Sequence, residues 1–461
     1  MTGYPLTGDR AHAAVLESEA TYARLELEGD YAPTTFEAWR ERFGFPSRTS
    51  DESLESWRRR AGVYVYYNLN ELGLGRELGC AEFADHDDEG APATGTACFV
   101  TNYGATFDNL QESFADAVRG SPVRNTVCIA FIPSLPEGAE VQFFVYGTTG
   151  QRQTWAQLDH LGARPHPFVC TNCHGGAHDP DEHLTSGARF LPTQPYNLWF
   201  GPEAPYDRAS QEEAIRRANA LAFGAGPDGN ADQKLTAAQR EVLASLYAHD
   251  GGDIQTPGQV ISPTWVPPEW NGSPLEADLY AKVIDPYCMT CHAALEGSAY
   301  ERLATPEELL PWISKSVCGD FSMPNAHQTS RRFWGAGGAV DIAGQDHASA
   351  ADALLAWAGL ERDTCAELED VVSCARDGRP EHDLCGNDHS GRVCLTSGHC
   401  GPDLGGVTSL DYEAPLGYCE IAGPRGCPSG TTCLPLAATT PDGWGDGACY
   451  GCGQPGMPAC P

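Results

Sequence analysis

Two kinds of hydrophobic spacing alternate along the first 169 residues. Apolar side chains recur at helical intervals in residues 11–27, 35–43 and 106–118. Residues 63–67 and 139–146 are instead rich in β-branched and aromatic side chains, and a Gly-Thr-Thr-Gly turn follows the second of these runs. Helices and strands mixed in this way predict an α+β N-terminal domain over residues 1–169.

Helical spacing dominates the middle of the chain, on both sides of a connector at residues 256–274. The helical stretches are residues 205–223, 235–248, 275–284, 305–316 and 349–360. Five prolines make the connector stiff and extended. We therefore predict two mainly α modules, one over residues 170–255 and one over residues 256–362. The whole chain is expected to be a multidomain α+β protein.

Local patterns mark where three of these helices begin. Thr34 or Thr35 is placed to cap the stretch that follows it, and Ser349 is placed to cap the last helix before residue 362. The Thr-Ala-Ala-Gln sequence from Thr236 matches a capping box.

Cysteine is concentrated at the end of the chain. Residues 363–461 hold 11 of the 19 cysteines, with glycine and proline between them. Such a composition is typical of a small exported unit that is held together by disulfides rather than by a core. We therefore expect an irregular, disulfide-rich C-terminal domain, and a periplasmic, outer-surface or extracellular location. The start of the chain shows no signal peptide, so we expect that an export signal has been removed.

Charge restricts the classes of partner. The 461 residues include 29 basic and 63 acidic side chains, which gives a formal charge of −34. Nucleic acids and anionic membrane surfaces attract cationic proteins, so neither is expected to bind this chain. No run reaches the roughly 18 apolar residues that a membrane-spanning helix needs.

The pattern C-x-x-C-H occurs twice, as CTNCH at residues 170–174 and as CMTCH at residues 288–292. In c-type haem attachment two thiols at this spacing bind the haem vinyl groups, and the histidine that follows binds the iron. At this composition roughly 0.02 occurrences are expected by chance. The pattern assigns covalent attachment to Cys170, Cys173, Cys288 and Cys291, and iron ligation to His174 and His292.

Other uses of these cysteines fit less well. The two pairs of a zinc site typically lie about 15–20 residues apart, whereas 114 residues separate Cys173 from Cys288. A thioredoxin-like motif needs a βαβ context that the sequence lacks. Ordinary disulfides would explain neither the shared spacing nor the shared histidine.

Elimination among the four methionines suggests a second axial ligand for the second haem. Met1 is terminal, Met289 lies inside the attachment motif, and Met457 lies in the cysteine-rich segment. Met323 remains, and the proline that follows it restricts the loop. A thioether ligand would favour reduced iron and so raise the haem potential. The alternative is a core methionine that fills a gap.

The segment around the second motif resembles a known protein family. Residues 280–360, with the attachment motif, a later Met-Pro and a closing helix, are similar to a compact class I-like c-type cytochrome domain. This resemblance implies that His292 and Met323 are the axial ligands, although the interval of 31 residues between them is short for the family. The wider pattern resembles uncharacterised exported di-haem cytochromes with cysteine-rich tails, of the kind found in myxobacteria.

The first haem lacks a methionine partner, since none occurs between Cys173 and Cys288. Its sixth ligand is a histidine, another group, or none. His183 is our tentative candidate, and His160, His166 and His249 remain open. His178 follows His174 by what would be one helical turn, which would keep it on the proximal side. Bis-histidine ligation would give a low-potential electron carrier, whereas an open position would permit peroxide chemistry.

Three functions follow from these expectations. The preferred hypothesis is a di-haem c-type cytochrome that transfers single electrons outside the cytoplasm to redox partners with a basic docking face. The second is a peroxidase-like haem oxidoreductase with an open first haem and the second haem as its electron port. The third is a haem protein that self-associates into extracellular arrays.

Four haem cysteines leave 15 of the 19. Because 15 is odd, at least one of these cysteines lies outside any intramolecular pair.

Overall fold

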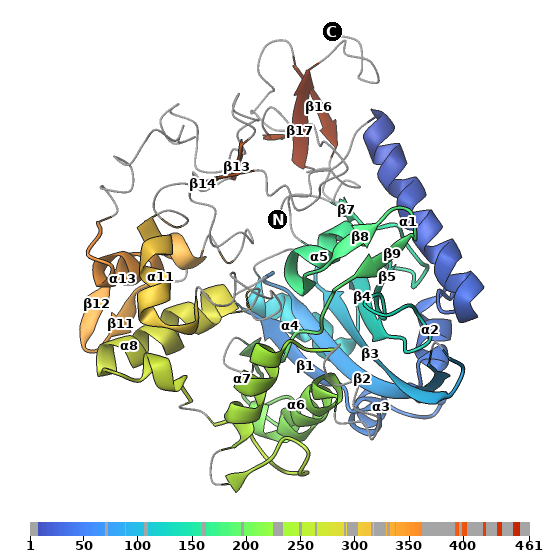
Figure 1. Ribbon diagram of the computed structural model, residues 1–461, viewed down its shortest axis with the longest axis horizontal. Coiled ribbons are helices and arrows are strands. Elements are labelled where there is room, and N and C mark those ends of the chain that lie inside the picture. The colour runs from blue at the N-terminus through green and yellow to red at the C-terminus, as the bar shows by residue number, and fades with distance from the viewer. Residues whose placement is uncertain are drawn as a thin grey trace.

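The computed structural model describes most of residues 8–361, and within residues 362–461 it describes the backbone of five strands. The gaps in the first range are 70–71, 88, 106–108, 159–162, 195–197, 225–233, 249–250, 263–264, 290–291, 293–302, 315–316, 318–328, 330–331 and 337. Helices and antiparallel sheets both contribute to the described parts (Figure 1).

A six-stranded antiparallel sheet organises the N-terminal part, with the order β10-β1-β2-β3-β4-β5. Its strands are β1 (Tyr64–Asn68), β2 (Gly75–His86), β3 (Pro92–Tyr103), β4 (Val123–Phe131), β5 (Val141–Tyr146) and β10 (Leu198–Trp199). The two strands predicted from the sequence are β1 and β5. All residues of both are buried, because helices cover both faces of the sheet.

An aromatic core fills the first face of the sheet. It is covered by α1 (Gly8–Gly29), α2 (Phe36–Arg42) and α3 (Leu54–Ala61). Helix α4 (Leu110–Arg119) packs against β1 and β3 and accepts hydrogen bonds from Arg58 of α3. Trp39 of α2 and Phe43, the C-cap of that helix, contact Phe144 of β5 with ring centroids 6.0 and 5.6 Å apart. Burial of such large rings is the main favourable term in holding the helices to the sheet.

The second face packs against α6 (Arg208–Phe223) and α7 (Ala237–Tyr247) (Figure 1). Ile215 and Leu243 from these helices join Tyr64, Ile129 and Phe143 in one core. Residues on both sides of position 169 therefore share a core. Residues 170–255 do not form a separate mainly α unit, because their strand β10 pairs with β1 and their helices cover the sheet.

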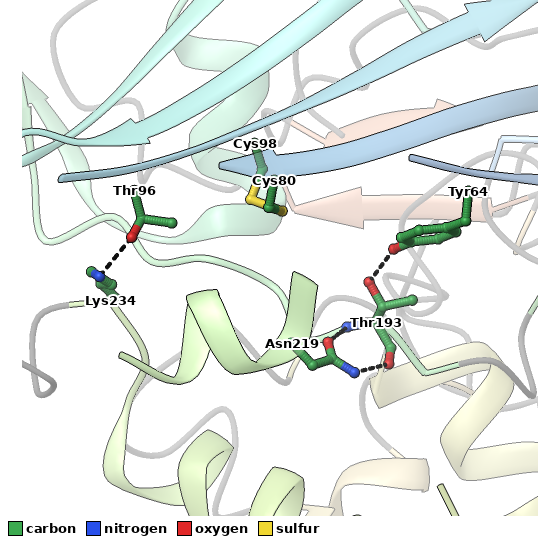
Figure 2. The surroundings of a disulfide bond; sticks show 7 residues. All are labelled: Tyr64, Cys80, Thr96, Cys98, Thr193, Asn219 and Lys234. Carbon is green, nitrogen blue, oxygen red and sulfur yellow. Dashed lines mark hydrogen bonds between the residues drawn. A yellow bond between two sulfur atoms is a disulfide. The ribbon is translucent and has the colours of Figure 1, made fainter. Parts of the chain in front are cut away.

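A cross-strand disulfide lies on this second face. Cys80 of β2 and Cys98 of β3 oppose each other in register, and their sulfur atoms are 2.07 Å apart. Figure 2 shows the polar contacts around the bond. The amine of Lys234, which precedes α7, donates to the hydroxyl of Thr96 at 2.8 Å, and burial lowers the pKa of Lys234 to about 8.

A second polar contact braces the other end of this interface. Asn219 of α6 exchanges two hydrogen bonds with the backbone of Thr193, at 2.8 and 2.9 Å, and the hydroxyl of Thr193 bonds that of Tyr64 (Figure 2). Buried polar groups that are fully paired fix one arrangement of the packed elements. The segment after the first C-x-x-C-H motif is therefore held firmly on the sheet.

All three predicted helix starts are present. Thr35 caps α2, since its hydroxyl accepts from the backbone N–H of Ala38. Thr236 and Gln239 form the capping box of α7, and Ser349 caps α13 (Ala350–Trp357). Local side-chain chemistry is enough to place each of these boundaries.

Residues 265–361 build a separate hydrophobic core (Figure 1, yellow to orange). Its elements are η4 (Pro268–Trp270), α8 (Pro274–Leu279), the π-helical η5 (Tyr280–Met289), α11 (Pro306–Trp312), η7 (Arg332–Ala336), the β11–β12 hairpin (Val340–Ile342 and Gln345–His347) and α13. Trp265 packs against both this core and the second-face core of the sheet. The predicted helix at 275–284 runs further, through α8 and η5 to Met289.

The described strands of the C-terminal segment form two small antiparallel sheets. One pairs β13 (Arg392–Leu395) with β14 (His399–Pro402). The other has the order β15-β17-β16, with bounds Tyr418–Glu420, Asp446–Gly451 and Thr431–Pro435. Throughout the part of the chain that the structure describes, no helix is both long and apolar enough to cross a membrane.

Candidate functional site

The first C-x-x-C-H motif forms a short helix of its own, α5 (Phe168–His174). The hairpin of β6 (Trp155–Gln157) and β7 (Ala163–Pro165) precedes it. The helix ends at His174 because Gly175 and Gly176 follow with φ of 68° and 79°, which side chains rarely adopt. A Cβ on Gly176 would lie 2.5 Å from the carbonyl oxygen of Ser186, so only glycine lets the chain turn back here.

Both cysteines of this motif lie against apolar side chains. Cys170 is a half-buried thiol beside Val145 and Val169, and burial raises its pKa to about 12. Cys173, one turn later, packs on Leu72 and Leu74. Side chains three residues apart share one face of a helix. The motif therefore presents two sulfur atoms in an apolar setting.

His174, the predicted iron ligand, is oriented by the backbone. Its Nδ1 lies 2.8 Å from the carbonyl oxygen of Arg189, and its ring packs on Phe143 with centroids 5.3 Å apart. A carbonyl only accepts hydrogen bonds, so Nδ1 carries the proton. In a neutral ring the lone pair then lies on Nε2, which is the arrangement of a metal-binding histidine with an outer hydrogen bond.

His183, the tentative sixth ligand, contacts a residue that the sequence did not single out. Its Nδ1 lies 2.8 Å from Oε1 of Glu17 on α1, and the same oxygen lies 2.6 Å from Nε2 of His178. Burial raises the pKa of Glu17, but the hydrogen bonds from both histidines outweigh this and leave it below the usual value. More than 160 residues separate Glu17 from these histidines, so no sequence pattern could reveal the contact.

The position of His178 corrects our helical argument. The helix ends at His174, and His178 lies instead in β8 (Ala177–Asp179), which pairs with β9 (Leu184–Ser186). Its ring packs edge-on against Phe168 at 5.2 Å. His178 is therefore not placed one helical turn after the proximal ligand.

His166 is excluded as an axial ligand. It is fully buried, its Nε2 donates to the carbonyl of Phe143 at 2.7 Å, and its Nδ1 lies 3.1 Å from the hydroxyl of Ser18. Tyr22 stacks on the ring at 4.7 Å. Both nitrogens are engaged within the core. His160 and His249, the other candidates, lie outside the described residues.

The burial of His166 predicts an acid-sensitive fold. Burial lowers its pKa to about 3, whereas an unfolded histidine titrates near 6.5. Between these values the unfolded chain binds the extra proton, so the free energy of unfolding should fall with decreasing pH by up to about 1.4 kcal/mol per unit. Between pH 7 and pH 5, the free energy of unfolding of the wild type should fall by about 2 kcal/mol more than that of His166→Gln. Denaturant titrations at the two pH values measure this difference.

The exposed His86 supplies the matched control for this experiment. His86→Gln should keep the wild-type pH dependence. Equal pH dependence of His166→Gln and the wild type would contradict the proposed role of the buried ring.

The second motif begins at the end of η5. Cys288 is half-buried and packs with the core of residues 265–361, and His292 is half-buried in a helical conformation. Cys291 and Met323 lie outside the described residues, so their predicted roles stay predictions. Asp285, which the sequence did not single out, lies one turn before Cys288, and burial raises its pKa to about 7.

Cys128 is a structural candidate for the unpaired cysteine that the odd count requires. It is a thiol buried in the aromatic core, on the opposite face of the sheet from the Cys80–Cys98 bond. Burial raises its pKa well above the usual value, which keeps the thiol protonated and unreactive.

Within the described residues, no group of three or more His, Cys, Asp or Glu side chains is placed to hold a bare metal ion. Comparison with known proteins gives no match: no family model fits the chain, and no curated protein or solved structure is similar to it.

Proposed function

We propose that this protein is an exported di-haem c-type cytochrome that transfers single electrons between partners outside the cytoplasm. The observation that carries the proposal is the occurrence of C-x-x-C-H at two places in one chain. Each haem iron would supply a one-electron step between its ferric and ferrous states. The chain's own task is then to hold two such groups and to present them to partners.

The residues of the first motif fit a covalently bound haem. Cys170 offers a neutral thiol in apolar surroundings, and Cys173 lies one turn away on the same short helix. The carbonyl of Arg189 fixes the His174 ring with its proton on Nδ1. A c-type haem uses two sulfur atoms for attachment and an oriented imidazole as an iron ligand, and it is surrounded by apolar side chains.

The second haem would occupy a cytochrome c-like module built from residues 265–361. Helices η5, α11, η7 and α13 share one core there, and Cys288 belongs to its edge. Tyr287 packs against Phe333 at 5.7 Å, which joins the motif segment to η7. His292 and Met323 would be the axial ligands in this proposal.

Charge supports the class of partner. A formal charge of −34, made more negative by haem propionates, would favour a redox protein with a basic face. Complementary charge of this kind mainly speeds encounter, so electron exchange should slow as salt concentration rises.

The direct test is the haem content of the full chain, exported in a bacterial host that attaches haem to C-x-x-C-H sequences. We expect the denatured protein to keep the mass of two haems, and pyridine haemochrome spectra to give two haems per chain. A folded protein without covalent haem would overturn the proposal. Ferric electron paramagnetic resonance then separates the functions: two low-spin signals support an electron carrier, whereas a high-spin first haem supports the oxidoreductase alternative.

A further inference from the structure

We propose that the C-terminal segment contains two cross-strand disulfides, Cys394–Cys400 and Cys433–Cys449. The strand register carries this inference. Cys394 of β13 stands directly opposite Cys400 of β14, and Cys433 of β16 stands directly opposite Cys449 of β17. None of these cysteines belongs to a C-x-x-C-H motif, so the inference is independent of the proposed haems.

The spacing of opposed strand positions suits a disulfide. Residues facing each other across an antiparallel pair have Cα atoms roughly 4.5–5.5 Å apart, within the roughly 4.4–6.8 Å that disulfides span. The chain supplies its own example. Cys80 and Cys98 occupy directly opposed positions of β2 and β3, and they are bonded.

The register also discriminates between cysteines. Cys419 of β15 stands opposite Gly447, although it belongs to the same sheet as Cys433 and Cys449. Two of the twelve register pairs described in this segment join cysteine to cysteine. Because 11 of these 99 residues are cysteines, a register pair chosen at random would join two cysteines about once in eighty pairs.

The proposed disulfides would stabilise strands that are too short to be stable alone. Each has between three and six residues, and an isolated two-stranded ribbon is marginal in water. A bond between Cys394 and Cys400 closes a hairpin of seven residues, and one between Cys433 and Cys449 ties two strands across a longer loop. Small units without a large core rely on such bonds.

The chemistry is thiol–disulfide exchange with an oxidising protein disulfide outside the cytoplasm. Each pair of thiols forms one S–S bond and gives up two protons and two electrons. The disulfide of the oxidising protein takes them up and becomes a dithiol.

Peptide mapping of the exported, full-length protein tests both bonds without any substitution. Thiols are alkylated in denaturant without reduction, and chymotrypsin and trypsin together then cut after Arg392, Leu395, Arg425 and Trp444. The members of each pair fall in different peptides, Cys385 and Cys419 are separated from them, and fragment-ion spectra locate the link within the peptide that holds both Cys427 and Cys433. We expect Cys394 and Cys433 in peptides linked to Cys400 and Cys449, respectively, and released by reduction. Alkylation of any of the four, or a link such as Cys449–Cys452 or Cys419–Cys449, would overturn the corresponding pair.

Single and double variants give an independent readout. Cys394→Ser should expose one new alkylated thiol, at Cys400, and Cys394→Ser/Cys400→Ser should expose none. Cys433→Ser should likewise expose Cys449. The Cys80→Ser variant should expose Cys98. It calibrates the measurement, because the Cys80–Cys98 bond is present in the structure. A new thiol at any other position would contradict the register.

Discussion

Replacing both thiols of the first motif, in Cys170→Ala/Cys173→Ala, is expected to reduce the covalent haem from two groups per chain to one. Thioether bonds at these sulfur atoms are the attachment that the motif provides, so the loss should be complete at that position. The haemochrome absorbance per chain should halve, and the mass of the denatured protein should fall by one haem. Cys288→Ala/Cys291→Ala should remove the other haem in the same way.

The chain contains a matched control for this experiment. Cys449 and Cys452 have the same C-x-x-C spacing, but no histidine follows them. Cys449→Ala/Cys452→Ala removes the proposed Cys433–Cys449 bond, but it should keep both haems. Haem loss in this control, or two haems in the Cys170→Ala/Cys173→Ala protein, would show that the histidine-containing motifs are not the attachment sites.

The largest effect on stability is expected at the buried ion pair of Arg58 and Glu77. Arg58 of α3 donates from Nε and Nη2 to one carboxylate oxygen of Glu77 at 2.8 and 2.6 Å, and both side chains are more than 90% buried. It also donates to the carbonyls of Ala117 and Val118 in α4, at 2.6 and 2.8 Å. The attraction of Glu77 outweighs burial and raises the pKa of Arg58. One side chain thus joins α3, α4 and β2.

Arg58→Ala should lower the free energy of unfolding by about 3–5 kcal/mol, because it leaves the Glu77 carboxylate buried without its cation. Denaturant unfolding followed by circular dichroism measures this loss. Arg58→Met/Glu77→Leu should lose less, since no charge is then stranded. Arg59 is the neighbouring control: its pair with Glu55 is solvent-exposed, so Arg59→Ala should cost at most about 1 kcal/mol. Equal losses at Arg58 and Arg59 would refute this account.

The features that the sequence predicted correctly depend on local chemistry. The two runs of aromatic and β-branched residues form β1 and β5. The predicted caps Thr35, Thr236 and Ser349 begin α2, α7 and α13. Glycines directly after His174 end α5, so the helical spacing of His174 and His178 does not place them on one helix. Period and capping are decided by residues a few positions apart, which is why they can be predicted.

Features that depend on distant pairing escaped prediction. Composition suggested a boundary at residue 169, but β10 adds to β1 across 130 residues and places the following helices on the sheet. The contact of Glu17 with His178 and His183 links positions more than 160 residues apart. The disulfide partner of Cys80 likewise required the register of β2 with β3. A single sequence carries no direct signal for such contacts.

The late position of α6 and α7 in the chain has a consequence for the timing of assembly. Synthesis proceeds from the N-terminus, so strands β1 to β5 and the motif helix α5 emerge before the helices that complete the second-face core. Cys170 packs against this second-face core, which stays incomplete until α7 has followed at residue 247. On the proposed function, this order of elements would give a haem an interval in which to reach Cys170 before α6 and α7 complete the core, provided that the exported chain also emerges N-terminus first.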